Sequence, residues 1–261
     1  MTIELGKNLD DNEARVATLW KEYAEVYPFL IHSTAFKELV ESVVDSSNIE
    51  KYAEVLDLGA GTGNVTDALL KKNPRAHITA LDNSREMITH LEGRYSNDPR
   101  VSIEHEDLGN TDMWEHKRRR EEKDGLIVSN LVLSYVTHFN GKRGKDVLPE
   151  LVRSIYGILS DGGTFVWSSP KDEVKFNRVF LDAIKHLDFA RVPGQSTLKG
   201  LRSAKKILDH ANEIAKLGEI GVFYFPSIEE IVNIMESNGF VDIDIKESFV
   251  KQANVITGKK V

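Results

Sequence analysis

Val55-Leu56-Asp57-Leu58-Gly59-Ala60-Gly61-Thr62-Gly63 is the stretch that decides the fold, because an apolar run passes directly into three alternating glycines. The apolar residues predict a buried strand, and the glycines let the backbone turn tightly and approach a ligand without side-chain clashes. A helix predicted at 64–72 presents its N-terminus to that ligand. The stretch therefore predicts a turn that holds a polar small molecule against the main chain.

The spacing of the glycines narrows the class of ligand. A dinucleotide fingerprint has glycines at its first, third and sixth positions, but counting from Gly59 the sixth position here is Asn64, and the third glycine is Gly63. This spacing disfavours NAD and FAD. No Gly-Lys-Ser/Thr sequence ends the run, which also disfavours a phosphate-binding P-loop.

Composition excludes several classes of mechanism and partner. The chain has 261 residues, a formal net charge of −7 and no cysteine. The length suits one α/β core with additions. The negative net charge argues against nonspecific electrostatic binding to nucleic acid or to an anionic membrane. Without cysteine there is no disulfide, no thiolate nucleophile and no Cys-based metal site, and we expect no metal. The polar N-terminus and the lack of a membrane-length apolar run predict a cytoplasmic protein.

From Ala53 onward the apolar pattern alternates between strands and helices. Such alternation indicates a parallel sheet with helices on both faces. The predicted strands are 54–58, 78–81, 101–104, 126–129 and 164–168. The predicted helices are 64–72, 85–95 and 145–159, the last of which ends at the run Ser160-Asp161-Gly162-Gly163.

Three other segments depart from this alternation. Residues 11–44 read as one or two helices. Residues 171–226 are predicted to be a helical insertion with a break at Pro193-Gly194; it carries ten Lys/Arg and seven Asp/Glu, a net charge of +3, whereas the rest of the chain carries −10. A capping box at Ser227 opens a last helix that stops at Asn238-Gly239. Only a few residues separate the final strands, 241–246 and 253–258, so these strands must be antiparallel neighbours.

Acidic residues follow the predicted strands at a regular interval. Asp57, Asp82 and Asp107 are each 25 residues apart, which is about one strand–helix–strand unit. Ligands of a doubly wound sheet bind outside the carboxyl ends of its strands, so we expect these acids to converge on one crevice. A carboxylate after the second strand suits a ribose diol, and one after the third strand suits an exocyclic amine such as that of adenine.

With these residues in place, the sequence resembles the class I S-adenosylmethionine (SAM)-dependent methyltransferases over about 53–169 and 227–258. The resemblance implies a Rossmann-like α/β fold: a doubly wound, mostly parallel seven-stranded sheet with an antiparallel C-terminal hairpin, plus a helical cap. It implies SAM as the cofactor. It also implies an N-terminal helical segment (1–52) over the cofactor pocket, a SAM-binding core (53–170 and 227–261) and an inserted cap on the acceptor side (171–226).

The resemblance further assigns expected roles in SAM binding. The glycine run beginning at Asp57 packs against the methionine part, Asp82 takes the ribose hydroxyls, and Asn83 lies beside the adenine. Asp107 contacts the adenine amine and the Leu108 N–H pairs with the ring, while main-chain carbonyls near Asn130 take the methionine ammonium. The complete expected set is Tyr23, Asp57, Gly59, Gly61, Gly63, Asp82, Asn83, Asp107, Leu108 and Asn130.

Tyr27 and His138 are the candidates for catalysis. Methyl transfer is an in-line displacement whose thioether leaving group needs no proton, so alignment in a dry pocket is the main task. A base helps only when the acceptor is a hydroxyl, an ammonium or an acidic carbon. His138 could serve there, or it could be an ordinary surface or core histidine. Tyr23 and Tyr27 resemble aromatics that close the pocket in related enzymes, but two aromatics at helical spacing are also typical of core packing.

The residues after the fourth strand bear on the acceptor. Related nucleic-acid amino-methylases carry an Asn/Asp-Pro-Pro-aromatic tetrad there, whereas this chain has Ser129-Asn130-Leu131-Val132. The mixed charges of residues 115–124 likewise predict a solvated helix rather than a nucleic-acid contact. We therefore predict methyl transfer to an O, N or C atom of a small molecule, with no membrane partner and no indication of oligomeric state. A protein, peptide or RNA methyltransferase and a non-catalytic SAM-binding regulator stay open as alternatives.

Overall fold

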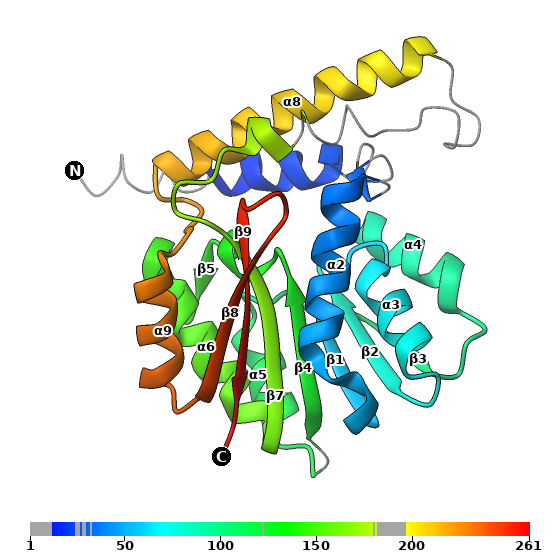
Figure 1. Cartoon of the computed structure of the whole chain (residues 1–261), viewed down its shortest axis with the longest axis vertical. Helices are drawn as coiled ribbons and strands as arrows, with labels where there is room; N and C mark the ends of the chain where they lie inside the picture. Colours follow the sequence, from blue (N-terminus) through cyan, green and yellow to red (C-terminus); the bar gives the residue numbers. More distant parts are fainter. Residues whose placement is uncertain are drawn as a thin grey trace.

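A seven-stranded sheet of order β3-β2-β1-β4-β7-β9-β8 forms the centre of the protein in a computed structural model (Figure 1). The structure describes residues 12–23, 27, 30–31, 33–121, 123–179, 181 and 197–261. The strands are β1 (Glu54–Leu58), β2 (His77–Asp82), β3 (Val101–His105), β4 (Asp124–Asn130), β7 (Leu159–Pro170), β8 (Val241–Ser248) and β9 (Ala253–Lys259).

The pairing of the strands confirms the predicted doubly wound sheet. β1 pairs in parallel with β2 and β4, β2 with β3, and β4 with β7. β9 runs antiparallel to both β7 and β8 and lies between them. The five parallel strands therefore end at one edge of the sheet, where ligands of such folds bind.

Helices cover both faces because successive side chains of each strand point to opposite sides. Within β1, Val55 packs into one apolar core and its neighbour Leu56 into the other. The first core is closed by α2 (Thr34–Ser47), α3 (Asn64–Lys72) and α4 (Arg85–Tyr95). The second is closed by α5 (Thr111–Arg118), α6 (Val147–Ile158) and α9 (Ile228–Ser237).

Local signals at helix ends match the structure closely. α3 begins directly after Gly63, whose φ of +85° is a left-handed conformation that favours glycine. At α9, the Ser227 side chain accepts from the Glu230 N–H and the Glu230 carboxylate accepts from the Ser227 N–H, which is the predicted capping box.

Between β4 and β7, two predicted boundaries were wrong and one small hairpin was not predicted. The run Ser160-Asp161-Gly162-Gly163 is part of β7 and not a separate helix stop. A short 3₁₀ turn (Gly144–Asp146) precedes α6, which begins at Val147. A small hairpin of β5 (His138–Phe139) and β6 (Lys142–Arg143) lies between β4 and α6, and its strands of two residues are too short for a period-2 pattern.

The predicted solvated helix at 115–124 also needs correction. α5 ends at Arg118, and Lys117 is buried, with its ammonium 2.6 Å from a Glu104 carboxylate oxygen. The charge run therefore includes a buried cation, Lys117, whose ion-pair partner is Glu104. Its mixed signs could not reveal this pair, because the partner lies on β3.

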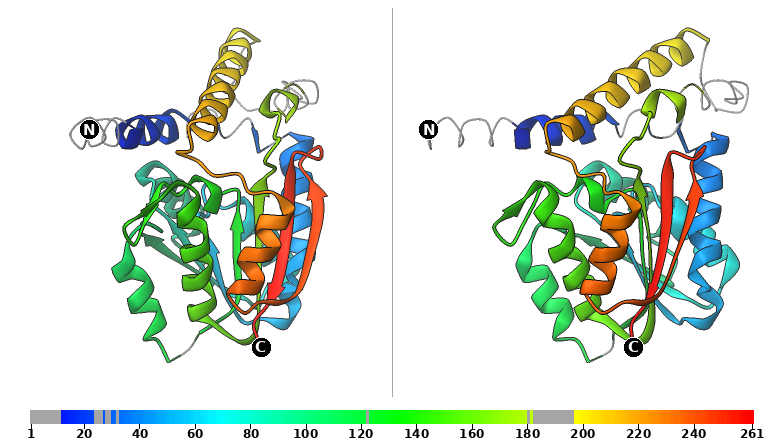
Figure 2. Two further views of the ribbon diagram at one scale, coloured as in Figure 1. Left: turned by 90° about the vertical axis from the view of Figure 1, so that its left-hand side faces the viewer. Right: turned by 60° about the vertical axis from the view of Figure 1, so that its left-hand side comes forward.

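The N-terminal helix of residues 12–23 and α8 (Thr197–Glu219) lie together above the carboxyl edge of the sheet (Figures 1 and 2). Arg15 and Glu213 form an ion pair between them. The predicted insertion is helical at 176–179 and in α8, but residues 220–226 are not helical, because Gly221 turns the chain with a φ of +74°. The predicted break at Pro193-Gly194 lies outside the described residues.

Within the described part of the chain, no helix combines the length and apolar character needed to cross a membrane.

Candidate functional site

A cavity of about 330 Å³ opens at the carboxyl edge of the parallel strands. This volume lies at the lower end of the range typical of small-molecule sites, roughly 300–1,000 Å³. Its walls come from the ends of β1 to β4, the helix of residues 12–23 and the loop before β5. Its lining includes Glu13, Trp20, Tyr23, Tyr27, Gly59, Gly61, Asp82, Asn83, Glu106, Asp107, Leu108, Asn130, Val132, Tyr135 and His138.

The glycine turn forms the floor of the cavity. Gly59 has a φ of +71°, and its N–H and that of Ala60 both donate to the Leu81 carbonyl at the end of β2, over 2.8 and 2.9 Å. A Cβ built on Gly59 would lie 2.4 Å from a Val132 methyl group. The turn is therefore closely packed against the loop after β4, and only glycine fits at its first position.

Asp82 ends β2 and lies beside the turn. Its two carboxylate oxygens accept the N–H groups of Gly61, over 2.8 Å, and Ser84, over 2.9 Å. Burial raises the pKa of the Asp82 carboxyl, and these backbone hydrogen bonds oppose that rise. The side chain thus joins the glycine turn to the start of α4 while it faces the cavity.

Asp57 does not line the cavity. Its side chain points beneath the turn, where it is 1% exposed and accepts a 2.7 Å hydrogen bond from the Thr66 hydroxyl of α3. Burial raises the pKa of this carboxyl to about 7, against the opposing effect of the Thr66 hydrogen bond. Asp57 is therefore a support behind the floor, and the expected convergence of three acids on the crevice holds only for Asp82 and Asp107.

Asp107 and Asn130 lie at the ends of the neighbouring strands. An Asp107 carboxylate oxygen accepts from the Gly109 N–H over 2.8 Å, which fixes the loop after β3. The Asn130 side-chain oxygen accepts from the Ser168 hydroxyl over 2.7 Å, and the same hydroxyl accepts from the Leu131 N–H over 2.9 Å. The loop after β3 is therefore held by a contact within the loop, and the loop after β4 is held by contacts to Ser168 of β7.

Aromatic side chains close the cavity from above, and we call Trp20, Tyr23, Tyr27 and Tyr135 the aromatic roof. The Trp20 ring lies 5.6 Å from Tyr23 and 5.3 Å from Tyr135, and Tyr23 lies 5.5 Å from Tyr27. Burial raises the pKa of the hydroxyls of Tyr23 and Tyr135, and that of Tyr27 to about 12. All three hydroxyls therefore keep their protons at neutral pH.

His138 and Glu13 are polar groups on the opposite part of the lining. The His138 Nδ1 lies 3.3 Å from the Thr137 hydroxyl, and the ring is half-buried at the start of β5. Glu13 accepts from Arg143 of β6 over 2.7 Å, which attaches the N-terminal helix to the small hairpin. Tyr27 of the aromatic roof reaches the floor with its hydroxyl end, because a Cβ on Gly61 would be 3.6 Å from its hydroxyl oxygen.

The structure thus brings most of the predicted site residues to one cavity, with Asp57 and Gly63 as the exceptions. Sequence reasoning missed Trp20, Tyr135 and Glu13. The apolar spacing of the first helix did single out Trp20, but as a core position. No sequence signal connects it with Tyr135, because the two are far apart in the chain.

A family model described as "Methyltransferase domain" matches residues 56–165. The malonyl-[acyl-carrier protein] O-methyltransferase of Bacillus cereus is 29% identical over 59% of this chain and 49% of that protein. The enzyme of that name from Bacillus anthracis is 24% identical over 89% of this chain and 78% of that protein. The trans-aconitate 2-methyltransferase of Methylobacterium nodulans is 31% identical over 45% of this chain and 38% of that protein. The chain thus spans about half the length of the first of these relatives.

Solved structures match the fold. N-methyltransferase NodS from Bradyrhizobium japonicum, in complex with S-adenosylhomocysteine, superposes with a TM-score of 0.56 at 13% identity, over 92% of this chain and 98% of that chain. Human N-acetylserotonin methyltransferase in complex with SAM gives a TM-score of 0.52 at 15% identity, over 85% of this chain and 51% of that chain. Residues 56–165 thus match a methyltransferase domain, and the fold of the chain is similar to that of solved methyltransferases in complex with SAM or S-adenosylhomocysteine.

Proposed function

We propose that this chain transfers the methyl group of SAM to an oxygen, nitrogen or carbon atom of a small-molecule acceptor. The observation that carries the proposal is a cavity with a glycine-turn floor, a buried carboxylate at the end of β2 and an aromatic roof. The relatives support the acceptor class, since their names specify malonyl and trans-aconitate groups.

The cavity lining suits SAM in charge and in hydrogen-bonding capacity. A carboxylate has about four lone-pair sites, and the two backbone N–H groups leave the rest of Asp82 able to accept a ribose diol. Among the described lining residues, Glu13, Asp82, Glu106 and Asp107 are acidic and none is Lys or Arg. Such a lining favours a ligand that carries positive charge, as SAM does.

We assign the remaining cofactor contacts to residues at the ends of β2, β3 and β4. Asn83 and Leu108 flank the site of the adenine, with Asp107 placed to accept from its amine. The main-chain carbonyl at Asn130 would take the methionine ammonium. Asp57 and Gly63, which lie outside the lining, would act through the turn that they support.

The chain contributes alignment and exclusion of water. When bound, SAM supplies an electrophilic methyl group on a sulfonium. The aromatic roof would keep water from the reaction path, and positioning of this kind can lower a barrier by about 7–11 kcal/mol. We assign the helix of residues 12–23 to an N-terminal cover (1–52), and α8 to an acceptor-side cap (171–226), over the core of 53–170 and 227–261.

His138 is the residue that we propose as a base when the acceptor must lose a proton. It lies at the cavity wall, and imidazole is the side chain that most often acts as a general base in enzymes. Tyr27 suits this role less well than its sequence position suggested, because a hydroxyl with a pKa of about 12 stays protonated and acts as a donor. Tyr27 would instead close the cofactor end of the cavity.

The test is methyl transfer from labelled SAM to defined acceptors. Malonyl thioesters and trans-aconitate represent the acids named for the relatives, and a panel of neutral alcohols and amines represents acceptors that the acidic lining would tolerate. Release of labelled product with any of these compounds supports the proposal. Binding of SAM without transfer to small molecules, protein or RNA would instead favour the non-catalytic regulator.

A further inference from the structure

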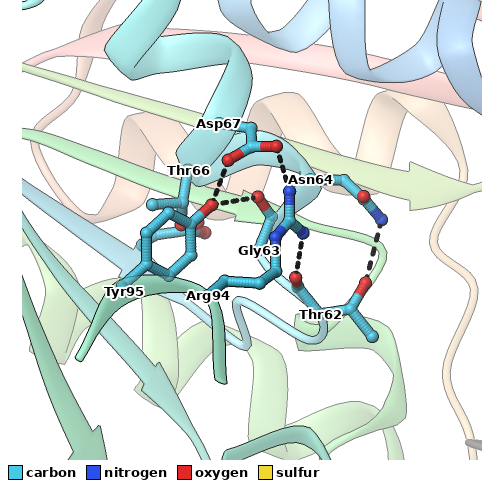
Figure 3. A network of polar contacts seen from close by, with 8 residues as sticks. Thr62, Gly63, Asn64, Thr66, Asp67, Arg94 and Tyr95 are labelled. Carbon is cyan, nitrogen blue, oxygen red and sulfur yellow. Dashed lines mark hydrogen bonds and ion pairs between the residues drawn. The ribbon is translucent and has the colours of Figure 1, made fainter. Parts of the chain in front are cut away.

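A polar network contacts the glycine turn on its outer side (Figure 3), through side chains that do not line the cavity. It is formed by the last two residues of α4, Arg94 and Tyr95, together with Asp67 of α3, and we call these three residues the outer clamp. The Tyr95 hydroxyl donates to the Gly63 carbonyl over 3.0 Å and also contacts the Asp67 carboxylate. The Arg94 guanidinium contacts the Thr62 carbonyl and the Asp67 carboxylate.

The turn is therefore held from two sides. On the inner side, its N–H groups donate to the Leu81 carbonyl and to Asp82. On the outer side, two of its carbonyls accept from the outer clamp. A segment that is held at both its donors and its acceptors has little conformational freedom left to lose when a ligand binds to it.

The Tyr95 ring packs so closely against Gly63 that a residue with a side chain would not fit there. A Cβ on Gly63 would lie 2.7 Å from the Tyr95 ring and 2.9 Å from its hydroxyl oxygen. Gly63 is not part of the cavity lining, and neither are Arg94 and Tyr95. The last glycine of the run thus allows close approach of Tyr95, not of the ligand.

We propose that Arg94 and Tyr95 are positioning residues that set the affinity for the cofactor by preorganising the glycine turn. The inference rests on the proposed function, because it concerns the same cofactor site. Ordering a loop before binding removes that cost from the binding step. Since neither side chain reaches the cavity, the chemical step at saturating SAM should be unaffected.

Two substitutions test the clamp, and the chain offers a matched control for each. Tyr95→Phe removes the hydroxyl but keeps the ring against Gly63. Its control is Tyr52→Phe, because Tyr52 also packs on a glycine, Gly125, and loses one hydrogen bond of 2.6 Å, to Thr164, away from the cavity. Both variants keep their packing, so differences in stability alone should be small.

Arg94→Lys keeps the positive charge but removes the guanidinium group, whose two terminal nitrogens contact the Thr62 carbonyl and the Asp67 carboxylate at the same time. Its control is Arg100→Lys, which alters another Arg–Asp ion pair of similar exposure, with Asp98. The measurements are calorimetric dissociation constants for SAM and S-adenosylhomocysteine, melting temperatures without ligand, and KM and kcat once an acceptor is known.

Tyr95→Phe should raise the dissociation constant for SAM by about 3- to 10-fold and Arg94→Lys by about threefold, as expected for the loss of one or two hydrogen bonds. The controls should bind SAM as the unaltered chain does, and KM for SAM should rise while kcat stays unchanged.

Equal affinity in Tyr95→Phe and the unaltered chain would overturn the inference alone, as would an equal loss in the Tyr52 control. If the unaltered chain binds no SAM, both the inference and the proposed function fail.

Discussion

The floor and the roof of the cavity differ in how far apart in the sequence their residues lie. The floor combines strand ends whose acids, Asp82 and Asp107, are separated by one strand–helix–strand unit, and backbone hydrogen bonds fix the glycine turn beside Asp82. The roof brings Trp20 to within 5.3 Å of Tyr135 and 6.0 Å of Phe223, and ring contacts dominate there. A change in the floor should therefore alter folding and cofactor affinity together, whereas a change in the roof should alter turnover first.

Gly59→Ala should give the largest effect. The new methyl group would meet Val132 at 2.4 Å, and alanine at a φ of +71° is strained, so we expect a loss of about 4 kcal/mol in the free energy of unfolding and no detectable SAM binding. Gly162→Ala is the control, because Gly162 has a similar φ of +76° with nothing within 4 Å. Denaturant unfolding that gives equal losses for both variants would show that the contact with Val132 is not what requires glycine.

Trp20→Ala tests the roof. We expect kcat/KM to fall by about 100-fold, since a poorly aligned and wetter pocket can cost that much, while the core stays folded. The matched substitution is Trp114→Ala in the second core, where Trp114 is 1% exposed and should cost about 3–5 kcal/mol of stability. The contrast between floor and roof disappears if Trp20→Ala unfolds the chain as readily as Trp114→Ala.

Asp57→Asn tests the support beneath the floor through its pH dependence. A carboxyl whose pKa is about 7 in the folded state, above its ordinary value of 3.8, destabilises the fold as pH rises through that interval. The asparagine variant stays neutral, so its stability relative to the unaltered chain should increase by on the order of 2–3 kcal/mol between about pH 5 and about pH 8. Urea unfolding across this range measures the difference, and a constant difference would mean that Asp57 titrates normally.

Asp82→Asn should give the smallest effect of the four. The amide oxygen can replace one carboxylate oxygen as an acceptor, but the amide nitrogen cannot accept from the N–H of Gly61 or Ser84. SAM affinity should fall by about tenfold, or 1.4 kcal/mol, and the melting temperature should fall as well, because one backbone N–H loses its acceptor. Unchanged affinity in the calorimeter would remove Asp82 from the proposed cofactor site.

The sequence predicted the sheet and several helix bounds because local signals determine them. α3 and α4 have the bounds predicted from their apolar periodicity, and the Ser227 capping box opens α9 as predicted. The sequence could not show that the Asp57 side chain points away from the cavity or that Lys117 is buried. Both depend on partners in other elements, Thr66 of α3 and Glu104 of β3. The same holds for the roof, since ring contacts between distant segments leave no periodic signal.

The position of β9 has a consequence for synthesis of the protein. β7 carries Phe165 and Trp167 and pairs on one side with β4, but its other side pairs with β9, which is the last strand in the chain. While the polypeptide leaves the ribosome, β1 to β4 and β7 can assemble from N-terminus to C-terminus, yet β7 keeps an unpaired edge until residues 253–259 have emerged. An exposed apolar edge strand is a site of aggregation, so the nascent chain should depend on chaperones most in the interval before β9 emerges.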